Sequence, residues 1–306
     1  MIRYLAGRLF ALVPVALGVA TLTFAIIHLV PGDPVVAMLG ETAAPADIAG
    51  MRHELGLDKP ILIQYAEFIG GIAHGQLGES ISYRRSVMSL IAERYPATLE
   101  LAAAGLVVAI LVAFPLGMIA GNDPGGPGDL SAMGLAIVGI SLPRIYLGPL
   151  LMVVFSLHLR LLPLTGRGGV EHLILPAVTL GTALAAIIAR MLRQSLVQVR
   201  ASEYMRTARS KGLSAAAALI RHGLRNALTP VVTLLGLELG GLLTGALITE
   251  VIFSWPGLGR LLIGAIGARD YPLVEGCVLA FALSYVVVNM LTDLVYSLID
   301  PRVRRS

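Results

Sequence analysis

The sequence has few charged residues, few aromatic residues and a single cysteine. Asp, Glu, Lys and Arg make up 14% of its 306 residues, whereas soluble domains usually carry about 25%. Apolar residues account for 56%, and several apolar runs reach the ~20 residues that are needed to cross a hydrocarbon core. This composition excludes a soluble globular domain and indicates an integral membrane protein with several spans.

The scarcity of cysteine and of charge also narrows the possible partners. Cys277 is the only cysteine and lies in an apolar run, so no internal disulfide and no thiolate metal cluster can form. The formal net charge of +4 is small and localised. We therefore attribute the charge to membrane topology and expect no nucleic acid among the partners.

Sequence motifs of the common catalytic classes are missing. His53-Glu54 is not followed by a second histidine at helical spacing, so the zinc-protease helix is absent. The sequence has no nucleophile elbow of the G-x-S-x-G type and no Walker A loop. We therefore expect no catalytic residue, no metal site and no cofactor in this chain.

Six apolar runs of membrane length predict an all-α, polytopic fold with six transmembrane helices. They cover residues 9–30, 97–120, 130–157, 173–199, 228–252 and 273–299. The first run is too long for the core of a signal peptide, so we interpret it as a retained span. Pro143-Arg144 interrupts the third run. The segment 35–95 is too polar to span but contains short amphipathic stretches, which predicts a small extracytoplasmic helical subdomain after the first helix.

The chain is expected to have two regions. Residues 1–96 hold the first span and the extracytoplasmic subdomain, and residues 97–306 hold the other spans with a cytoplasmic loop at 201–226. Basic residues are dense near both termini and around this loop and are more thinly spread elsewhere. Because cytoplasmic segments of membrane proteins are enriched in Lys and Arg, we expect both termini in the cytoplasm.

The loop 201–226 is the densest basic segment of the chain. Ser202 is a candidate cap for a first short helix, and Gly212 suits the left-handed residue that ends such a helix. Ser214 is a candidate cap for a second helix, from Ala215 to about Gly223. The pattern predicts a compact helix–glycine–helix unit, and the alternative is an ordinary basic loop that only sets the topology.

The loop segments Glu203–Leu213 and Arg221–Pro230 resemble the cytoplasmic loop of bacterial ABC-transporter permeases. Specifically, the chain resembles the B-type permease of the dipeptide, oligopeptide and nickel importer family. Further motifs of that family recur along nearly the whole chain: Pro31–Pro34, Leu55–Pro60, Pro96–Glu100, Leu175–Ala177, Trp255–Arg260, Arg269–Pro272 and Asp300–Arg302. Together these motifs are highly specific, whereas each one alone is weak.

The resemblance implies a type I importer permease in the bacterial inner membrane. Its expected partners are a second permease of the C type, two nucleotide-binding subunits that use ATP and Mg²⁺, an extracytoplasmic solute-binding protein and membrane lipid. The expected solute is a dipeptide or oligopeptide; nickel, a nickel chelate or a glutathione-like peptide is the alternative. A stand-alone secondary transporter is a remote alternative, because the sequence lacks the inverted repeats that many such transporters contain.

The resemblance also implies that the loop docks on an ATPase subunit. The expected coupling residues are Glu203, Tyr204, Arg206, Thr207, Ala208, Lys211, Gly212 and Leu213. The general permease motif has Glu-Ala-Ala and then a glycine four positions later. Ala208 and Gly212 fit this motif, but Arg206 stands where the glutamate would be, so the role of that glutamate is not carried over.

A polar stripe in the fifth apolar run is the candidate translocation pathway. Glu238, Gly241, Gly245 and Thr249 recur at helical spacing and share one helix face. Small residues let helices approach closely, and an ionisable residue in a span rarely faces lipid. Glutamine is common at the position of Glu238 in the similar family, so its charge is a departure. The alternative is that Glu238 only packs against another helix.

Overall fold

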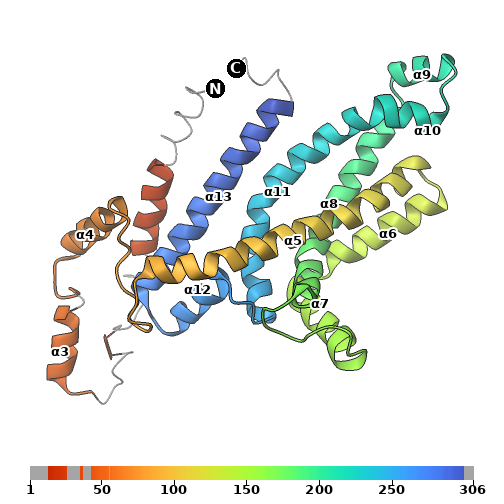
Figure 1. Ribbon diagram of the computed structural model, residues 1–306. Coiled ribbons are helices and arrows are strands. Elements are labelled where there is room, and N and C mark those ends of the chain that lie inside the picture. The colour runs from red at the N-terminus through yellow and green to blue at the C-terminus, as the bar shows by residue number, and fades with distance from the viewer. Residues whose placement is uncertain (1–12, 26–34, 37–42, 55, 300–306) are drawn as a thin grey trace. The chain divides into compact units, whose positions relative to one another are not determined.

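The computed structural model describes residues 13–25, 35–36, 43–54 and 56–299, shown as coloured ribbon in Figure 1. Regular structure in this described part is helical, and only an isolated bridge joins Glu79 and Ser86. The all-α prediction is therefore confirmed. The chain divides into two compact units, one of residues 1–98 and 256–286 and the other of residues 99–255 and 287–306.

The first unit is built from short helices and the beginnings of two long ones. Its elements are the helix Val13–Ala25, α3 (Pro45–Glu54), α4 (Ile61–Ala73), α12 (Leu258–Gly267) and the first parts of α5 (Val87–Asn122) and α13 (Tyr271–Ile299). The ring of Phe24 packs edge-on against Tyr65 at 5.3 Å and stacks on Phe68 at 5.8 Å between centroids. These aromatic contacts attach α4 of the predicted subdomain to the first helix.

Some sequence predictions fall on residues that the structure does not describe. The predicted first span, residues 9–30, is described only over Val13–Ala25. The motifs at residues 31–34 and 300–302 lie outside the described residues.

Asp270 joins two distant segments of the first unit. Its buried carboxylate accepts hydrogen bonds from the hydroxyl of Ser80 at 2.6 Å, from the amide of Ser82 at 3.0 Å and from the amide of Leu273 at 3.3 Å. The bonds from Ser80 and Ser82 connect Asp270 to residues that are 190 and 188 positions away in the sequence. The Arg269–Pro272 motif therefore has a structural function here, because its carboxylate satisfies donors that burial would otherwise leave unpaired.

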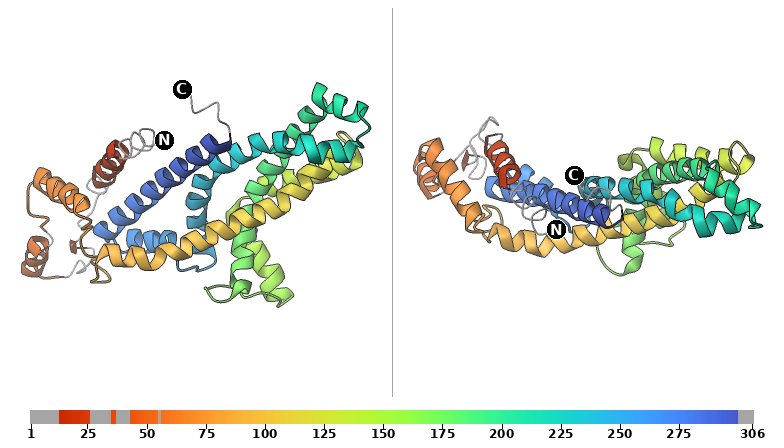
Figure 2. Two further views of the ribbon diagram at one scale, coloured as in Figure 1. Left: turned by 45° about the horizontal axis from the view of Figure 1, so that its top comes forward. Right: turned by 90° about the horizontal axis from the view of Figure 1, so that it is seen from above.

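The second unit is arranged around α8 (Val170–Arg200). Its other elements are the rest of α5, α6 (Pro127–Ser141), α7 (Arg144–Leu151), η1 (Met152–His158), α9 (Glu203–Ser210), α10 (Ala215–Ala218), η2 (Leu219–Gly223), α11 (Leu224–Ile252) and the end of α13. α8 contacts α6, α7 and α11, and the right view of Figure 2 shows the yellow-green α6 beside the green α8. Among the candidate spans, α8 has the largest buried share, as expected for a central helix.

The described part of the chain contains four helices that are long and apolar enough to cross a membrane. They are α5, α8, the continuous helix Ala215–Ile252 and α13. The predicted third run is a pair of helices, Pro127–Ser141 and Arg144–His158, which bend by 103° at the break that the sequence placed at Pro143. Counting this pair as one span gives five spans in the described residues. The remaining predicted span is the first one, of which the structure describes only Val13–Ala25.

Glycines bring α5 and α8 into close contact. At three positions of α5, an added Cβ would lie 2.8 to 2.9 Å from a leucine side chain of α8, which is too close for real carbon atoms. The pairs are Gly105 with Leu180, Gly117 with Leu192, and Gly121 with Leu196. Small residues at helix contacts are the usual means of tight packing in membranes, where apolar surface alone gives no driving force between helices.

The α5–α8 contact predicts opposite effects for two glycine-to-alanine substitutions. In Gly117→Ala the new methyl group would lie 3.0 Å from the carbonyl oxygen of Ala189 as well as against Leu192, so we expect a loss of about 1–3 kcal/mol of stability. Gly134 of α6 has nothing within 4 Å, and Gly134→Ala is expected to be neutral or stabilising because alanine favours helix. Thermal unfolding of both purified variants in detergent measures this; equal melting temperatures would refute the close contact.

Candidate functional site

The predicted helix stop in the basic loop is confirmed by the backbone. Gly212 follows α9 with φ of +89°, in the left-handed region where glycine is favoured. The amide of Gly212 donates to the carbonyl of Arg209 at 3.0 Å, and the amide of Leu213 donates to the carbonyl of Ala208 at 3.4 Å. This pair of bonds is the Schellman arrangement, which satisfies carbonyls at a helix end and turns the chain sharply.

α9 has one buried face and one exposed face. Met205 and Ala208 are buried, and a Cβ on Gly223 would lie 3.4 Å from the sulfur of Met205 and 2.9 Å from Val199. The predicted coupling residues on the exposed side are Glu203, Tyr204, Arg206, Thr207, Lys211 and Gly212, whereas Leu213 is half-buried. α9 therefore packs against the rest of the unit through Met205 and Ala208, and its polar side chains are exposed on the other side.

The two predicted helix caps have different outcomes. The hydroxyl of Ser214 accepts a hydrogen bond from the amide of Ala217 at 3.2 Å, so this cap is confirmed. Ser202 occupies the predicted N-cap position of α9, but its hydroxyl donates to the carbonyl of Val199 at 2.5 Å and caps no amide. Serine often bonds to a carbonyl of the preceding helical turn, and here that bond competes with the cap.

The second predicted loop helix does not end at Gly223. α10, η2 and α11 form one uninterrupted helical trace from Ala215 to Ile252, with a π-helical turn at Leu219–Gly223. Gly223 keeps a right-handed conformation, with φ of −90°, and serves the close contact with Val199 instead of a helix stop. The helix–glycine–helix unit is therefore a short helix followed by the start of a long one.

Two arginines of α8 bind the turn between α5 and α6. Arg193 makes a two-point ion pair with the buried carboxylate of Asp129, with both nitrogen–oxygen distances at 2.5 Å, and Asp129 also accepts from the amide of Gly125 at 2.8 Å. Arg200 donates to the side-chain oxygen of Asn122 at 2.8 Å and to backbone carbonyls of the same turn. Arg193 and Arg200 are seven residues apart, about two helical turns, so they reach the turn from one face of α8.

The predicted pathway stripe is only partly open. Glu238 is half-buried and Gly241 is exposed, whereas Gly245 and Thr249 are buried. The hydroxyl of Thr249 donates to the carbonyl of Gly245 at 3.3 Å, as polar residues in spans commonly do. The open part of the stripe in this structure is the stretch around Glu238 and Gly241.

Two charged residues near the stripe were not singled out from the sequence. The guanidinium of Arg144, at the start of α7, lies over Gly245 and interacts electrostatically with Glu238. Glu250 is fully buried and has interaction partners within the chain. The sequence places Arg144 only at a helix interruption, because nothing in the local pattern links it to a residue 94 positions away.

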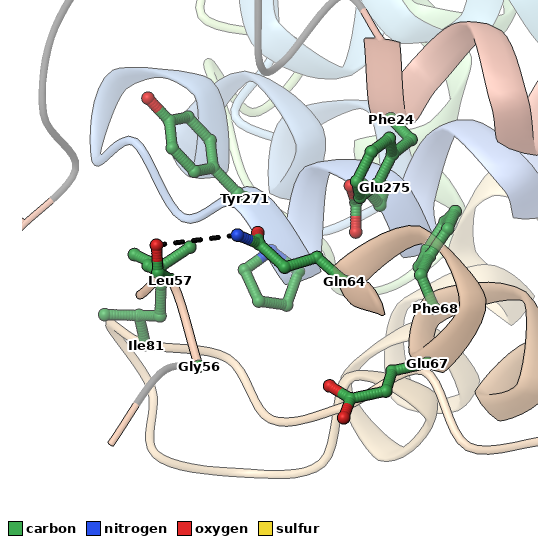
Figure 3. Close-up of a pocket in the computed structure, with 10 residues that line it drawn as sticks. Phe24, Gly56, Leu57, Gln64, Glu67, Phe68, Ile81, Tyr271 and Glu275 are labelled. Carbon is green, nitrogen blue, oxygen red and sulfur yellow. Dashed lines mark hydrogen bonds between the residues drawn. The ribbon is translucent and has the colours of Figure 1, made fainter. Parts of the chain in front are cut away.

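A cavity of about 160 Å³ lies in the first unit, as Figure 3 shows. Its walls come mainly from the aromatic and polar side chains of Phe24, Gln64, Glu67, Phe68, Tyr271 and Glu275. The amide of Gln64 donates to the carbonyl of Leu57, drawn as a dashed line, and to that of Lys59 at 2.8 Å; the ammonium of Lys59 pairs with Glu67 at 2.6 Å. None of the predicted site residues lines this cavity.

Comparison with known families matches the chain along most of its length. Residues 113–305 match the family described as "Binding-protein-dependent transport system inner membrane component", and residues 1–102 match the N-terminal family of such membrane components. The dipeptide transport system permease protein DppB of Escherichia coli strain K12 is 41% identical, with all of both chains covered. The glutathione transport system permease protein GsiC of Salmonella choleraesuis is 42% identical, with 99% of each chain covered.

Solved structures share the fold at low sequence identity. A chain of the inward-facing MetNI methionine ABC transporter matches with a TM-score of 0.57 and 16% identity, over 70% of this chain and 97% of that one. A chain of an amino acid ABC transporter matches with a TM-score of 0.52 and 19% identity, over 70% and 94%. The likeness supports the predicted fold class of an importer permease.

The Asp129–Arg193 pair predicts a position-dependent effect of neutralising a carboxylate. In Asp129→Asn one acceptor becomes a donor that faces the guanidinium, and the pair is buried on the aspartate side, so we expect a clear fall in melting temperature. Glu203→Gln is the matched control, because Glu203 pairs with Arg206 at 3.1 Å on an exposed helix surface. Thermal unfolding of both variants is the measurement, and equal shifts would contradict a structural function for Asp129.

Proposed function

The chain belongs to the family of binding-protein-dependent transport system inner membrane components, and we propose that it is the permease subunit of an ATP-driven importer of peptides. One observation carries the peptide class: full-length identity above 40% to permeases named for dipeptides and for glutathione, itself a tripeptide. Nickel and nickel chelates are less well supported, because neither relative is named for a metal. Because the chain belongs to a family of binding-protein-dependent transport components, we do not propose a stand-alone secondary transporter.

The chain contributes the membrane passage and no catalytic step. It is a multi-pass protein of the inner membrane, and permeases of this family work with ATPase and binding-protein partners. We propose that these partners are two nucleotide-binding subunits, which bind ATP and Mg²⁺, an extracytoplasmic solute-binding protein and a second permease of the C type. The peptide would pass between the two permeases.

We propose α9 as the element that docks on an ATPase subunit. The exposed polar face from Glu203 to Lys211 supports this, because Met205 and Ala208 fix the other face to the permease. A short helix that is anchored on one side and bound by a partner on the other can transmit a rigid-body movement. The turn at Gly212 sets the angle at which α9 leaves its neighbour, so the positive φ of Gly212 is part of the docking geometry.

Glu238 and Gly241 are proposed to line the translocation pathway. A carboxylate within a span is costly unless it is paired or hydrated, which favours a position away from lipid. Its half-buried position beside the exposed Gly241 supports contact with a polar passage. Gly245 and Thr249 complete the proposed stripe but are covered in this structure.

The proposed function predicts ATP-dependent uptake that depends on Gly212. Proteoliposomes holding the complete complex and its binding protein should accumulate a labelled dipeptide only when ATP is present. Gly212→Val should reduce uptake strongly while leaving membrane insertion intact, because a β-branched residue at positive φ costs on the order of 1 kcal/mol or more. Gly264→Val is the matched control, since Gly264 lies on an open face of α12 with nothing within 4 Å. Absence of uptake by the unmodified complex would refute a peptide importer, and normal uptake by Gly212→Val would refute the turn requirement.

The proposed orientation predicts which introduced cysteines react from outside. We expect Ala215→Cys, at the exposed start of α10, to be protected from an impermeant thiol reagent in intact cells, because this loop would be cytoplasmic. Ser86→Cys, at an exposed position of the first unit, should react without permeabilisation. The native Cys277 is buried and gives a low background. Reaction of Ala215→Cys in intact cells would reverse the orientation.

A further inference from the structure

Arg144 places a guanidinium beside the proposed pathway. It is the first residue of α7, directly after the 103° break that separates α6 from α7. α7 contacts both α8 and α11, and Arg144 itself is half-buried. An arginine in this position is costly in hydrocarbon, so its charge must meet water, a protein group or a ligand.

Two glycines of α11 leave room for the charged groups of Arg144 and Glu238. A Cβ built on Gly245 would lie 2.8 Å from the central guanidinium carbon of Arg144, so no larger residue fits there with Arg144 in this position. A Cβ built on Gly241 would lie 3.6 Å from a carboxylate oxygen of Glu238. The guanidinium thus lies over one glycine and the carboxylate near the glycine four residues earlier, and these two glycines are about 6 Å apart along the helix axis.

This separation leaves the two charges attracted but not bonded. Glu238 acts on Arg144 electrostatically, yet within the described residues no hydrogen bond or ion pair within 4 Å engages the guanidinium of Arg144. Guanidinium presents five donors in a planar fork that matches a carboxylate with two parallel bonds. Arg144 therefore has donors to offer a carboxylate that comes from outside this chain, while Glu238 keeps the guanidinium oriented.

We infer that Arg144 is the residue of the pathway that binds the terminal carboxylate of the peptide, and that Glu238 holds it in position when the pathway is empty. This inference rests on the proposed peptide import. An arriving carboxylate would replace the attraction of Glu238 by direct bonds, so the charge of Arg144 stays compensated throughout. Because Glu238 is not bonded to Arg144, the exchange breaks no direct ion pair.

The experiment measures protection of a cysteine at the open glycine between the two charges. Gly241→Cys is introduced into the complete complex, reconstituted without the binding protein, and labelled with a small water-soluble thiol reagent. Among the described residues, only the Glu238 side chain lies within 4 Å of the Cβ position of Gly241, and the buried Cys277 contributes little signal. We expect L-alanyl-L-alanine to slow the labelling and its C-terminal amide to leave the rate unchanged, because only the free acid matches Arg144.

Variants of Arg144 and Glu238 separate ligand binding from a structural charge pair. In Gly241→Cys with Arg144→Gln, the dialanine concentration for half-protection should rise about tenfold or more, since charge-assisted hydrogen bonds are lost. Arg144→Lys should give an intermediate shift, because it keeps the charge without the planar fork. Glu238→Gln should preserve acid-specific protection, because Glu238 positions Arg144 only while the pathway is empty. Arg190→Gln, an exposed arginine of α8, is the matched control and should change nothing.

Each alternative gives a different result. Equal protection by the acid and the amide, or by neither, would overturn the inference, and this comparison needs no Arg144 variant to fold. Loss of companion subunits from Arg144→Gln, with no acid-specific protection in the parent complex, would make Arg144 a subunit contact. A parent complex that imports dialanine but shows no acid-specific protection refutes only the function of Arg144. A complex that imports no peptide refutes the proposed function itself.

Discussion

A bilayer interior offers no water to a polar group, and this constraint explains why polar side chains of the second unit find partners within the chain. Hydroxyls of its helices bond to carbonyls of the preceding turn, as Thr179 does to Leu175 at 2.8 Å and Thr233 to Thr229 at 3.1 Å. The carboxylate of Asp129 receives both an arginine and a backbone amide. A charged group that has no such partner in the chain is therefore informative, and Arg144 is such a group among the described residues.

Close backbone packing is the second consequence of the same constraint. Apolar side chains gain little by leaving lipid for another helix, so association depends on van der Waals contact and on satisfied polar groups. α5 and α8 use glycines for the contact, and Arg193 and Arg200 satisfy the polar turn at its end. Together these interactions hold α5, α6 and α8 as one group of helices.

Local signals in the sequence predicted a large part of this fold. The apolar runs predicted the central part of α5 and most of α8, and proline predicted the break before Arg144, because both signals are local. The start of α5, from Val87 to Tyr95, falls in the segment that was expected to belong to the extracytoplasmic subdomain. The left-handed turn at Gly212 also depends only on the local backbone. The second loop helix was expected to end at about Gly223, but glycine also allows close contact between helices, and the contact with Val199 is visible only in the packed structure.

Contacts between residues that are far apart in the chain could not be predicted from the sequence. Ser80 and Asp270 are separated by 190 residues, and Asp129 and Arg193 by 64. No periodic pattern relates the members of such pairs, since each side chain on its own resembles an ordinary loop or boundary residue. The polar stripe of α11 was visible from helical spacing, but the arginine that faces it belongs to another helix.

The position of α8 suggests how the two proposed sites communicate. Its C-terminal end leads directly into α9, and its side chains hold the α5–α6 turn through Arg193 and Arg200. α11 joins the same region without interruption through η2 and also carries Glu238 and Gly241. A displacement of α9 by a partner would therefore act on α8 and α11 together. Since Arg144 lies on α7, which contacts both helices, a small shift between them changes the separation of Arg144 and Glu238, and with it the ability of Arg144 to hold a carboxylate.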